Sequence, residues 1–155
     1  MTTKTHIEKP KLEPFFSNGW KNWNGRDWIL VDDWCASIRT ENYAIDIYVK
    51  AGLVTDGGSV PGFWHFRVNP MGPGLAGFLP HDVGYATHLT IKGEDVRYDY
   101  DCMMWELHRE ESGFGWSKAH AVYRAVRMCG WAPWKNRPQE AIDRANEYVT
   151  VISHH

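Results

Sequence analysis

The 155-residue chain has few cysteines, no long apolar run and no long basic run. Its three cysteines, Cys35, Cys102 and Cys129, cannot form a fully paired disulfide set and show no Cys-x-x-Cys spacing, so a reducing compartment is the simpler interpretation. A Cys102–Cys129 bridge between neighbouring helices stays open. The N-terminus lacks the apolar core of a signal peptide and no segment is long enough to span a bilayer, so export by a standard signal is not indicated.

The charge distribution argues against nucleic-acid binding. The formal net charge is -2, and without a long basic run the chain lacks the usual electrostatic footprint of a nucleic-acid-binding protein. Arg124 and Arg127 are interpreted as a solvated helix face. We therefore expect no nucleic-acid partner.

Tryptophan, in contrast, is abundant. The nine Trp residues either fill the core of a small, loop-rich domain or form an aromatic surface for lipid, sugar or a partner protein. Trp131 and Trp134 lie beside Gly130 and Pro133 in a predicted loop, so they are the better candidates for such a surface.

The length predicts one domain with a substantial core. Residues 1–19 mix Lys, Glu and Pro with little periodicity, which indicates an extended N-terminal arm, and residues 20–155 form a single α+β domain. Aromatic and β-branched residues within 28–55 predict a small antiparallel sheet of two to four strands. Residues 56–74 are rich in glycine and proline and are interpreted as a structured loop.

The C-terminal half predicts a bundle of three to four helices. The first helix begins either at Pro80, which is tolerated in a first turn, or near Leu75, in which case Pro80 should kink it. Further helices are expected over 97–112, 117–129 and 138–152. In the last of these, one stripe is formed by Ile142, Ala145, Val149 and Ile152.

Candidate catalytic residues gather in the segment 80–85. On a helix, His81 and Tyr85 share a face at i, i+4, while Asp82 lies about 100° around the axis. Histidine suits the task of a general base near neutral pH, and a carboxylate on its far nitrogen would fix the tautomer and stabilise the imidazolium. Asp101, on a second helix packed antiparallel to the first, is the candidate for that carboxylate.

Structural interpretations of the same residues remain open. A helical histidine is more often an ordinary core or surface residue, and the alternative role for Asp101 is to stabilise a helix N-terminus. Asp95 and Asp99 are rivals for its role. The other histidines lack zinc-site spacing, and Ser59 lies in no nucleophile elbow.

Oxygen ligands for a hard cation are also present. Asp82, together with Asp56 and backbone carbonyls of the Gly57–Gly58 turn, could hold Ca²⁺, which prefers oxygen. Such a cation would polarise an ester carbonyl while His81 activates water. A plain glycine turn explains the same residues equally well.

The order of Thr55-Asp56-Gly57-Gly58-Ser59-Val60-Pro61, then His81-Asp82-Val83-Gly84-Tyr85, then Asp101 resembles a family of uncharacterised proteins of bacteriophages and prophages. That family pairs a small N-terminal β part carrying T-D-x-x-S-V-P with helices carrying H-D-x-x-Y and a later Asp. The likeness covers about residues 28–131. It implies action in the cytoplasm of an infected bacterial host or in the virion, with phage structural proteins as partners.

The H-D-x-x-Y segment also resembles, more distantly, the catalytic helix of phospholipase A2, especially the bacterial type. This resemblance implies His81 as general base, Asp82 as a Ca²⁺ ligand, and Tyr85 as support for Asp101. It maps the calcium loop to Asp56 and the Gly57 carbonyl. The phospholipase cysteine framework is absent here.

Three hypotheses follow. The first is a phospholipase A2-like hydrolase that acts on a lipid ester at a membrane surface, with Ca²⁺ assisting. The second is a non-catalytic virion protein of the tail or connector, or an assembly protein. The third is a metal-dependent cell-wall hydrolase with a transition metal at His81 and Asp82. The sequence leaves the oligomeric state open.

Overall fold

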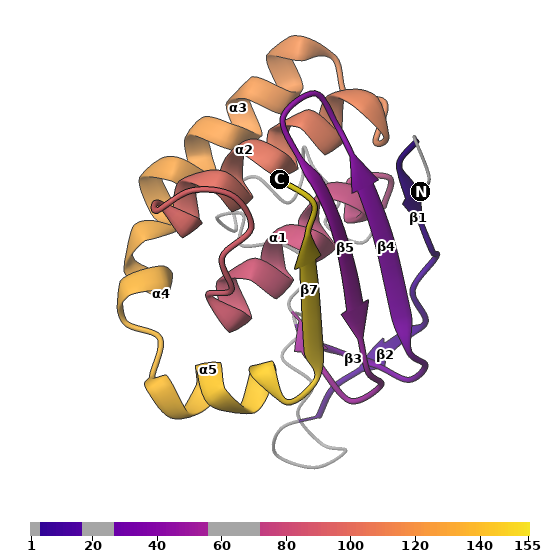
Figure 1. Cartoon of the computed structure of the whole chain (residues 1–155), viewed down its shortest axis with the longest axis vertical. Coiled ribbons are helices and arrows are strands. Elements are labelled where there is room, and N and C mark those ends of the chain that lie inside the picture. The colour runs from indigo at the N-terminus through magenta and orange to yellow at the C-terminus, as the bar shows by residue number, and fades with distance from the viewer. Residues whose placement is uncertain (1–3, 17–26, 56–71) are drawn as a thin grey trace.

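The computed structural model of the chain describes residues 4–16, 27–55 and 72–155. Within these residues, helices cover one face of an antiparallel sheet, and a second, smaller sheet lies at one end (Figure 1). The predicted α+β class is confirmed, with the N-terminal sheet region followed by helices.

The larger sheet has the strand order β1-β4-β5-β7, and every neighbouring pair is antiparallel. Its strands are β1 (His6–Ile7), β4 (Trp34–Arg39), β5 (Ala44–Val49) and β7 (Val149–Ser153). Buried and less buried residues alternate along β4 and β5, as expected for a sheet with one face on the core. This sheet face therefore packs against the helices.

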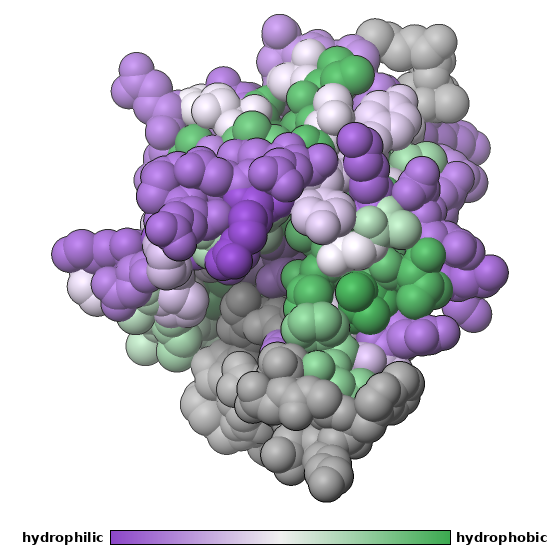
Figure 2. All heavy atoms as spheres, turned by 90° about the horizontal axis from the view of Figure 1, so that it is seen from below, coloured by the Kyte–Doolittle hydropathy of each residue, from purple (hydrophilic) through white to green (hydrophobic). Residues whose placement is uncertain are grey.

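The smaller sheet has the order β2-β3-β6, also antiparallel. Its strands are β2 (Leu12–Pro14), β3 (Trp28–Leu30) and β6 (Val54–Thr55). Seen from below, a hydrophobic patch lies on the strand side of the molecule and is bordered by hydrophilic residues, which also make up most of the opposite side (Figure 2). Val31 and Val54 are among the apolar residues exposed beside this sheet. Strands β1 and β2 show that parts of the predicted N-terminal arm form sheet edges.

Five helices follow within the described residues. They are α1 (Leu75–Thr87), α2 (Val96–Glu110), α3 (Trp116–Cys129), α4 (Trp131–Lys135) and α5 (Gln139–Asn146). The first helix begins at Leu75, so Pro80 lies inside it rather than in its first turn. Helices α2 and α3 lie within two residues of the predicted bounds.

The prediction of one helix over 138–152 is wrong in its second half. Helix α5 ends at Asn146, and the β-branched stretch that follows forms β7, which pairs with β5. The stripe that joined Ile142 to Val149 and Ile152 is therefore split between a helix and a strand. The reason is tertiary: β5 offers a free edge, and Val149, Val151 and Ile152 favour a pleated surface.

Helices α1 and α2 pack antiparallel, and a glycine allows their close approach. A Cβ added at Gly84 would collide with the ring of Tyr100. Gly77, further toward the start of α1, lies against His108, further along α2. The glycine inside the H-D-V-G-Y segment therefore serves helix packing. None of the helices among the described residues has both the length and the apolar character needed to cross a membrane.

Candidate functional site

The α1–α2 interface brings together the three residues predicted as catalytic. His81 Nε2 lies 2.7 Å from Asp101 Oδ1, and the Tyr85 hydroxyl donates to the same oxygen at 2.8 Å. His81 and Tyr85 are one helical turn apart on α1, and their rings lie 4.2 Å apart between centroids. Asp101 lies in the second turn of α2, so a single carboxylate bridges the two helices.

The second oxygen of Asp101 is held by arginine. Arg127 Nη1, on α3, donates to Oδ2 at 2.8 Å, and Arg97 Nε lies 3.8 Å from the same atom. Burial of the Asp101 carboxyl would raise its pKa, but hydrogen bonds from His81, Arg127 and Tyr85 outweigh this and lower it below the usual range. The buried carboxylate is therefore ionised and fully partnered.

His81 has one engaged and one unengaged ring nitrogen. Its side chain has 0% exposed surface, and among the described residues Nδ1 has no hydrogen-bond partner. An ionised carboxylate only accepts hydrogen bonds, so the contact with Asp101 requires a proton on Nε2. In the neutral ring, Nδ1 then carries the lone pair. This is the arrangement in which a histidine can accept a proton from water.

Tyr85 positions Asp101 rather than reacting itself. Its hydroxyl donates to Asp101 and accepts from Arg97 Nε at 3.0 Å. Burial, together with the charge of Asp101, raises the pKa of Tyr85 well above its ordinary value, so the phenol stays protonated. Trp134 packs edge-on against its ring at 5.0 Å, and a Cβ at Gly130 would approach its hydroxyl to 2.7 Å. The α3–α4 junction thus closes over Tyr85.

Asp82 faces a different neighbour. It is half-buried, and the Thr55 hydroxyl at the end of β6 donates to its Oδ2. Asp56 and Gly57, the other predicted metal ligands, lie outside the described residues. In the described part of the chain, no group of three or more His, Cys, Asp or Glu side chains is arranged to hold a metal ion.

The rival carboxylates have other roles. Asp95 accepts from the Tyr98 backbone N–H as the N-cap of α2. Asp99 accepts from the Gly93 backbone N–H at 2.8 Å and contacts the Tyr43 hydroxyl at 3.4 Å. Asp101 is the one of the three that meets His81.

Sequence reasoning missed the two arginines. Arg127 was assigned to a solvated helix face, which is wrong, because its guanidinium reaches Asp101 from α3. Arg97 precedes Asp101 by four residues on α2, so the i, i+4 spacing in the sequence could have predicted this ion pair. It also donates through Nη2 to the backbone carbonyls of Val126 and Arg127 at 3.1 and 2.6 Å, which ties α2 to the end of α3.

His108 is a second buried histidine on α2. Its ring lies against Phe78 and stacks on Phe114, with Nδ1 3.1 Å from the Ser112 hydroxyl. Burial, the largest cause, together with the charge of Lys118 lowers the pKa of His108 to about 3. It is therefore a neutral packing residue, not a base at neutral pH.

Two further expectations from the sequence concern the cysteines and the pair Trp131 and Trp134. All three cysteines are free, so Cys102 and Cys129 are not bridged. Trp131 and Trp134 belong to the short helix α4 rather than a loop. Trp131 is 55% exposed, whereas Trp134 is half-buried and stacks on His88 at 3.7 Å. Only Trp131 of this pair is a surface residue.

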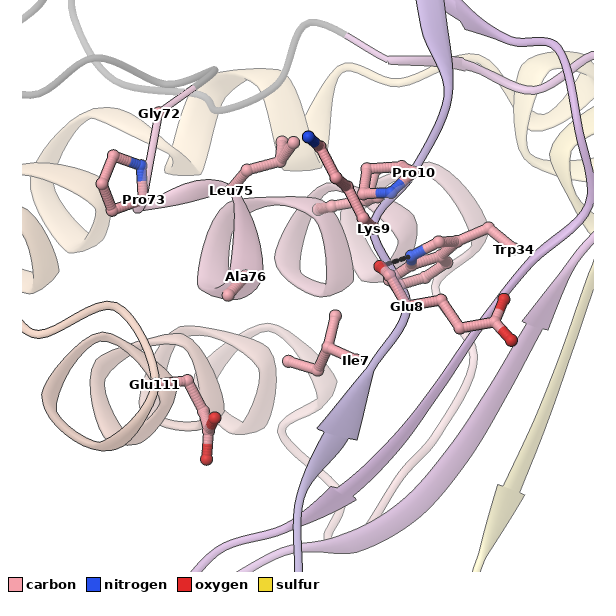
Figure 3. Close-up of a pocket in the computed structure, with 11 residues that line it drawn as sticks. Ile7, Glu8, Lys9, Pro10, Trp34, Gly72, Pro73, Leu75, Ala76 and Glu111 are labelled. Carbon is pink, nitrogen blue, oxygen red and sulfur yellow. Dashed lines mark hydrogen bonds between the residues drawn. The ribbon is translucent and has the colours of Figure 1, made fainter.

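A cavity of about 410 Å³ lies beside the start of α1. Figure 3 shows it between the β1–β2 segment, Trp34 and the first turns of α1. Its apolar lining includes Ile7, Pro10, Trp34, Leu75 and Leu79. The cavity does not include His81. By helical spacing, however, Leu75, Leu79 and Asp82 (i, i+4, i+7) share one face of α1.

Comparison of the chain with protein-family models, with curated proteins and with solved structures found no match.

Proposed function

We propose that this protein is a hydrolase that cleaves a carboxylic ester of a lipid, with His81 as general base. One observation carries the proposal: His81 Nε2 is held at 2.7 Å by a buried, ionised Asp101 while Nδ1 is left without a partner among the described residues. A histidine that only bridged two helices would gain stability from using both nitrogens. Nε2 of His88 and of His108 also lacks a partner among the described residues, but neither of those rings is held by a buried carboxylate, so the feature that favours chemistry at His81 is the unpaired Nδ1 combined with the Asp101 contact.

The proposed reaction uses water as nucleophile. Nδ1 of His81 takes a proton from water as the oxygen attacks the ester carbonyl carbon, and Asp101 stabilises the imidazolium that forms. When the tetrahedral intermediate collapses, the bond to the alkoxide oxygen breaks and the imidazolium returns the proton to that oxygen. The products are a carboxylic acid and an alcohol, and the protein ends in its starting protonation state.

The apolar part of the cavity lining favours a lipid over a small polar ester, while Glu8, Lys9 and Glu111 supply polar groups to the same lining. Its lining residues Leu75 and Leu79 lie on the same α1 face as Asp82, the neighbour of His81. The hydrocarbon chain of a lipid lying in the cavity along α1 would therefore direct its polar end toward His81 and Asp82. About 410 Å³ is within the range of ligand pockets for small molecules.

The experiment that tests the proposal is an assay of fatty-acid release from phospholipid vesicles by the wild-type chain. A water-soluble short-chain ester serves as a second substrate, because it reports the base without requiring the cavity. Release from either substrate above a buffer blank supports a hydrolase, and preference for the vesicles supports the lipid. Background rates on both substrates would contradict the proposal.

Calcium is a separate proposal, made for Asp82 with Asp56 and the Gly57 carbonyl. Its support is that Thr55, the residue before Asp56, contacts the Asp82 carboxylate. No catalytic step depends on it. We expect calorimetric titration of the wild type with Ca²⁺ to give a binding isotherm, and Asp82→Asn to weaken binding at least tenfold because a charged ligand is lost. An identical isotherm for wild type and variant would exclude Asp82 as a ligand.

A second candidate function is a non-catalytic component of a virion or of its assembly. The observation that favours it is the complete burial of His81, because turnover requires a movement that opens Nδ1 to substrate. In this alternative, Asp101 and its donors are a polar network that locks three helices together. We then expect the chain in purified particles by mass spectrometry, at a fixed ratio to the capsid protein. Absence from particles would count against this role.

A further inference from the structure

The charge of the chain is unevenly distributed. Residues 113–139 contain five Lys and Arg and no Asp or Glu. The formal charge is -2 overall and +5 over this segment, so the remaining residues carry -7. Helices α3 and α4 lie in this segment, and Figure 1 shows them on the side of the helices away from the larger sheet. An otherwise acidic protein thus presents one basic element.

One exposed stripe on this element mixes cations with apolar side chains. We call it the α3–α4 stripe; its members, at i, i+4, i+7 and i+11, are Arg124, Met128, Trp131 and Lys135. Met128 is 80% exposed and Trp131 is 55% exposed. The Lys135 ammonium lies 4.9 Å from the centroid of the Trp131 ring. A methionine and a tryptophan are therefore held in water between two cations.

The backbone keeps the stripe on one face. Gly130 N–H donates to the Val126 carbonyl at 2.7 Å, and Trp134 N–H donates to the Gly130 carbonyl at 3.1 Å, so helical hydrogen bonding continues across the α3–α4 junction. The opposite face of α3 is buried, where Val122 and Val126 are in the core. The stripe is thus the outer side of the junction whose inner side contacts Tyr85.

We propose that the α3–α4 stripe docks the protein on an anionic lipid surface. Cations near such a surface each contribute about 1 kcal/mol, and Trp and Met side chains gain by entering the boundary between headgroups and acyl chains. Nucleic-acid backbones would use the cations but leave Met128 exposed, so lipid accounts for more of the stripe. The docking does not depend on ester hydrolysis, because the lipid here is a surface and not the substrate.

The test is co-sedimentation with phosphatidylcholine vesicles prepared with and without phosphatidylglycerol. We expect the wild type to bind only the anionic vesicles, and added salt to weaken the binding as it screens the cations. Arg124→Glu with Lys135→Glu should reduce the binding constant at least tenfold, since each lost cation contributes roughly fivefold. Trp131→Ala should weaken it further without changing the salt dependence.

The matched control is Lys4→Glu with Lys50→Glu, which makes the same change in net charge at exposed positions of the strand side. Equal binding by the two double variants would overturn the proposal, as would wild-type binding that ignores phosphatidylglycerol or salt. The salt titration of the wild type stands even if a variant folds poorly. Binding to duplex DNA without binding to vesicles would overturn it in favour of a nucleic-acid partner.

Discussion

Replacing His81 by glutamine is expected to lower the rate of ester hydrolysis by about 10²–10⁴-fold, the usual contribution of a positioned general base. Glutamine is close to histidine in length and its amide N–H can still donate to Asp101, so the helix-bridging contact survives. The amide cannot accept a proton from water. The loss should therefore appear in kcat, measured as fatty-acid release from vesicles or hydrolysis of a short-chain ester.

The control for that variant is Val83→Ala, on the same helix and fully buried. It removes core packing, at a cost of about 2 kcal/mol, without touching His81. We expect Val83→Ala to keep the wild-type kcat at temperatures where it is folded, as judged by circular dichroism. Loss of activity in both variants alike would show that helix packing, not the base, was being measured. Wild-type kcat in His81→Gln would refute the role of His81.

Replacing Asp101 by asparagine is expected to lower the free energy of unfolding by about 3–5 kcal/mol at pH 7, the range for removing one partner from a buried ion pair. Asp101 is completely buried and accepts from His81, Tyr85 and Arg127. The asparagine amide has one acceptor oxygen and two donor hydrogens, so its NH2 group would face side chains that donate to Asp101 in the wild type. Urea denaturation of wild type and variant measures the difference.

The same pair of proteins should converge in acid. The pKa of Asp101 is lower in the folded state than its ordinary value of 3.8, so the folded state binds this proton more weakly than the unfolded state does. Its stabilisation is therefore fully present above pH 3.8 and is lost as the pH falls from there through the lowered folded pKa. Asp143→Asn, at an exposed position, is the control and should track the wild type. A stability difference between wild type and Asp101→Asn that is independent of pH would contradict an ionised Asp101.

The juxtaposition of His81, Tyr85 and Asp101 could be predicted because it depends on short-range rules. An i, i+4 pair on a helix must share a face, and two helices joined by a short connection usually pack antiparallel. The amphipathic periods of α2 and α3 indicated those helices for the same reason. Local spacing thus determined which side chains could meet.

Residues that act across long sequence distances could not be predicted in this way. Arg127 reaches Asp101 from a third helix, 26 residues on, and nothing in its neighbours distinguishes it from solvated Arg124. The burial of His108 depends on contacts with Phe78, which lies on α1, and with Phe114, which lies beyond the end of α2. Likewise, strand β7 needs the free edge of β5. Each depends on tertiary packing that a period in the sequence does not report.

The central claim is that Asp101 holds His81 with a free lone pair on Nδ1, and nitrogen-15 NMR of histidine-labelled protein tests it most directly. We expect a proton on Nε2 and none on Nδ1 at pH 8, with the signal assigned by its loss in His81→Gln. A proton on Nδ1, in either the other tautomer or the imidazolium, would contradict the account.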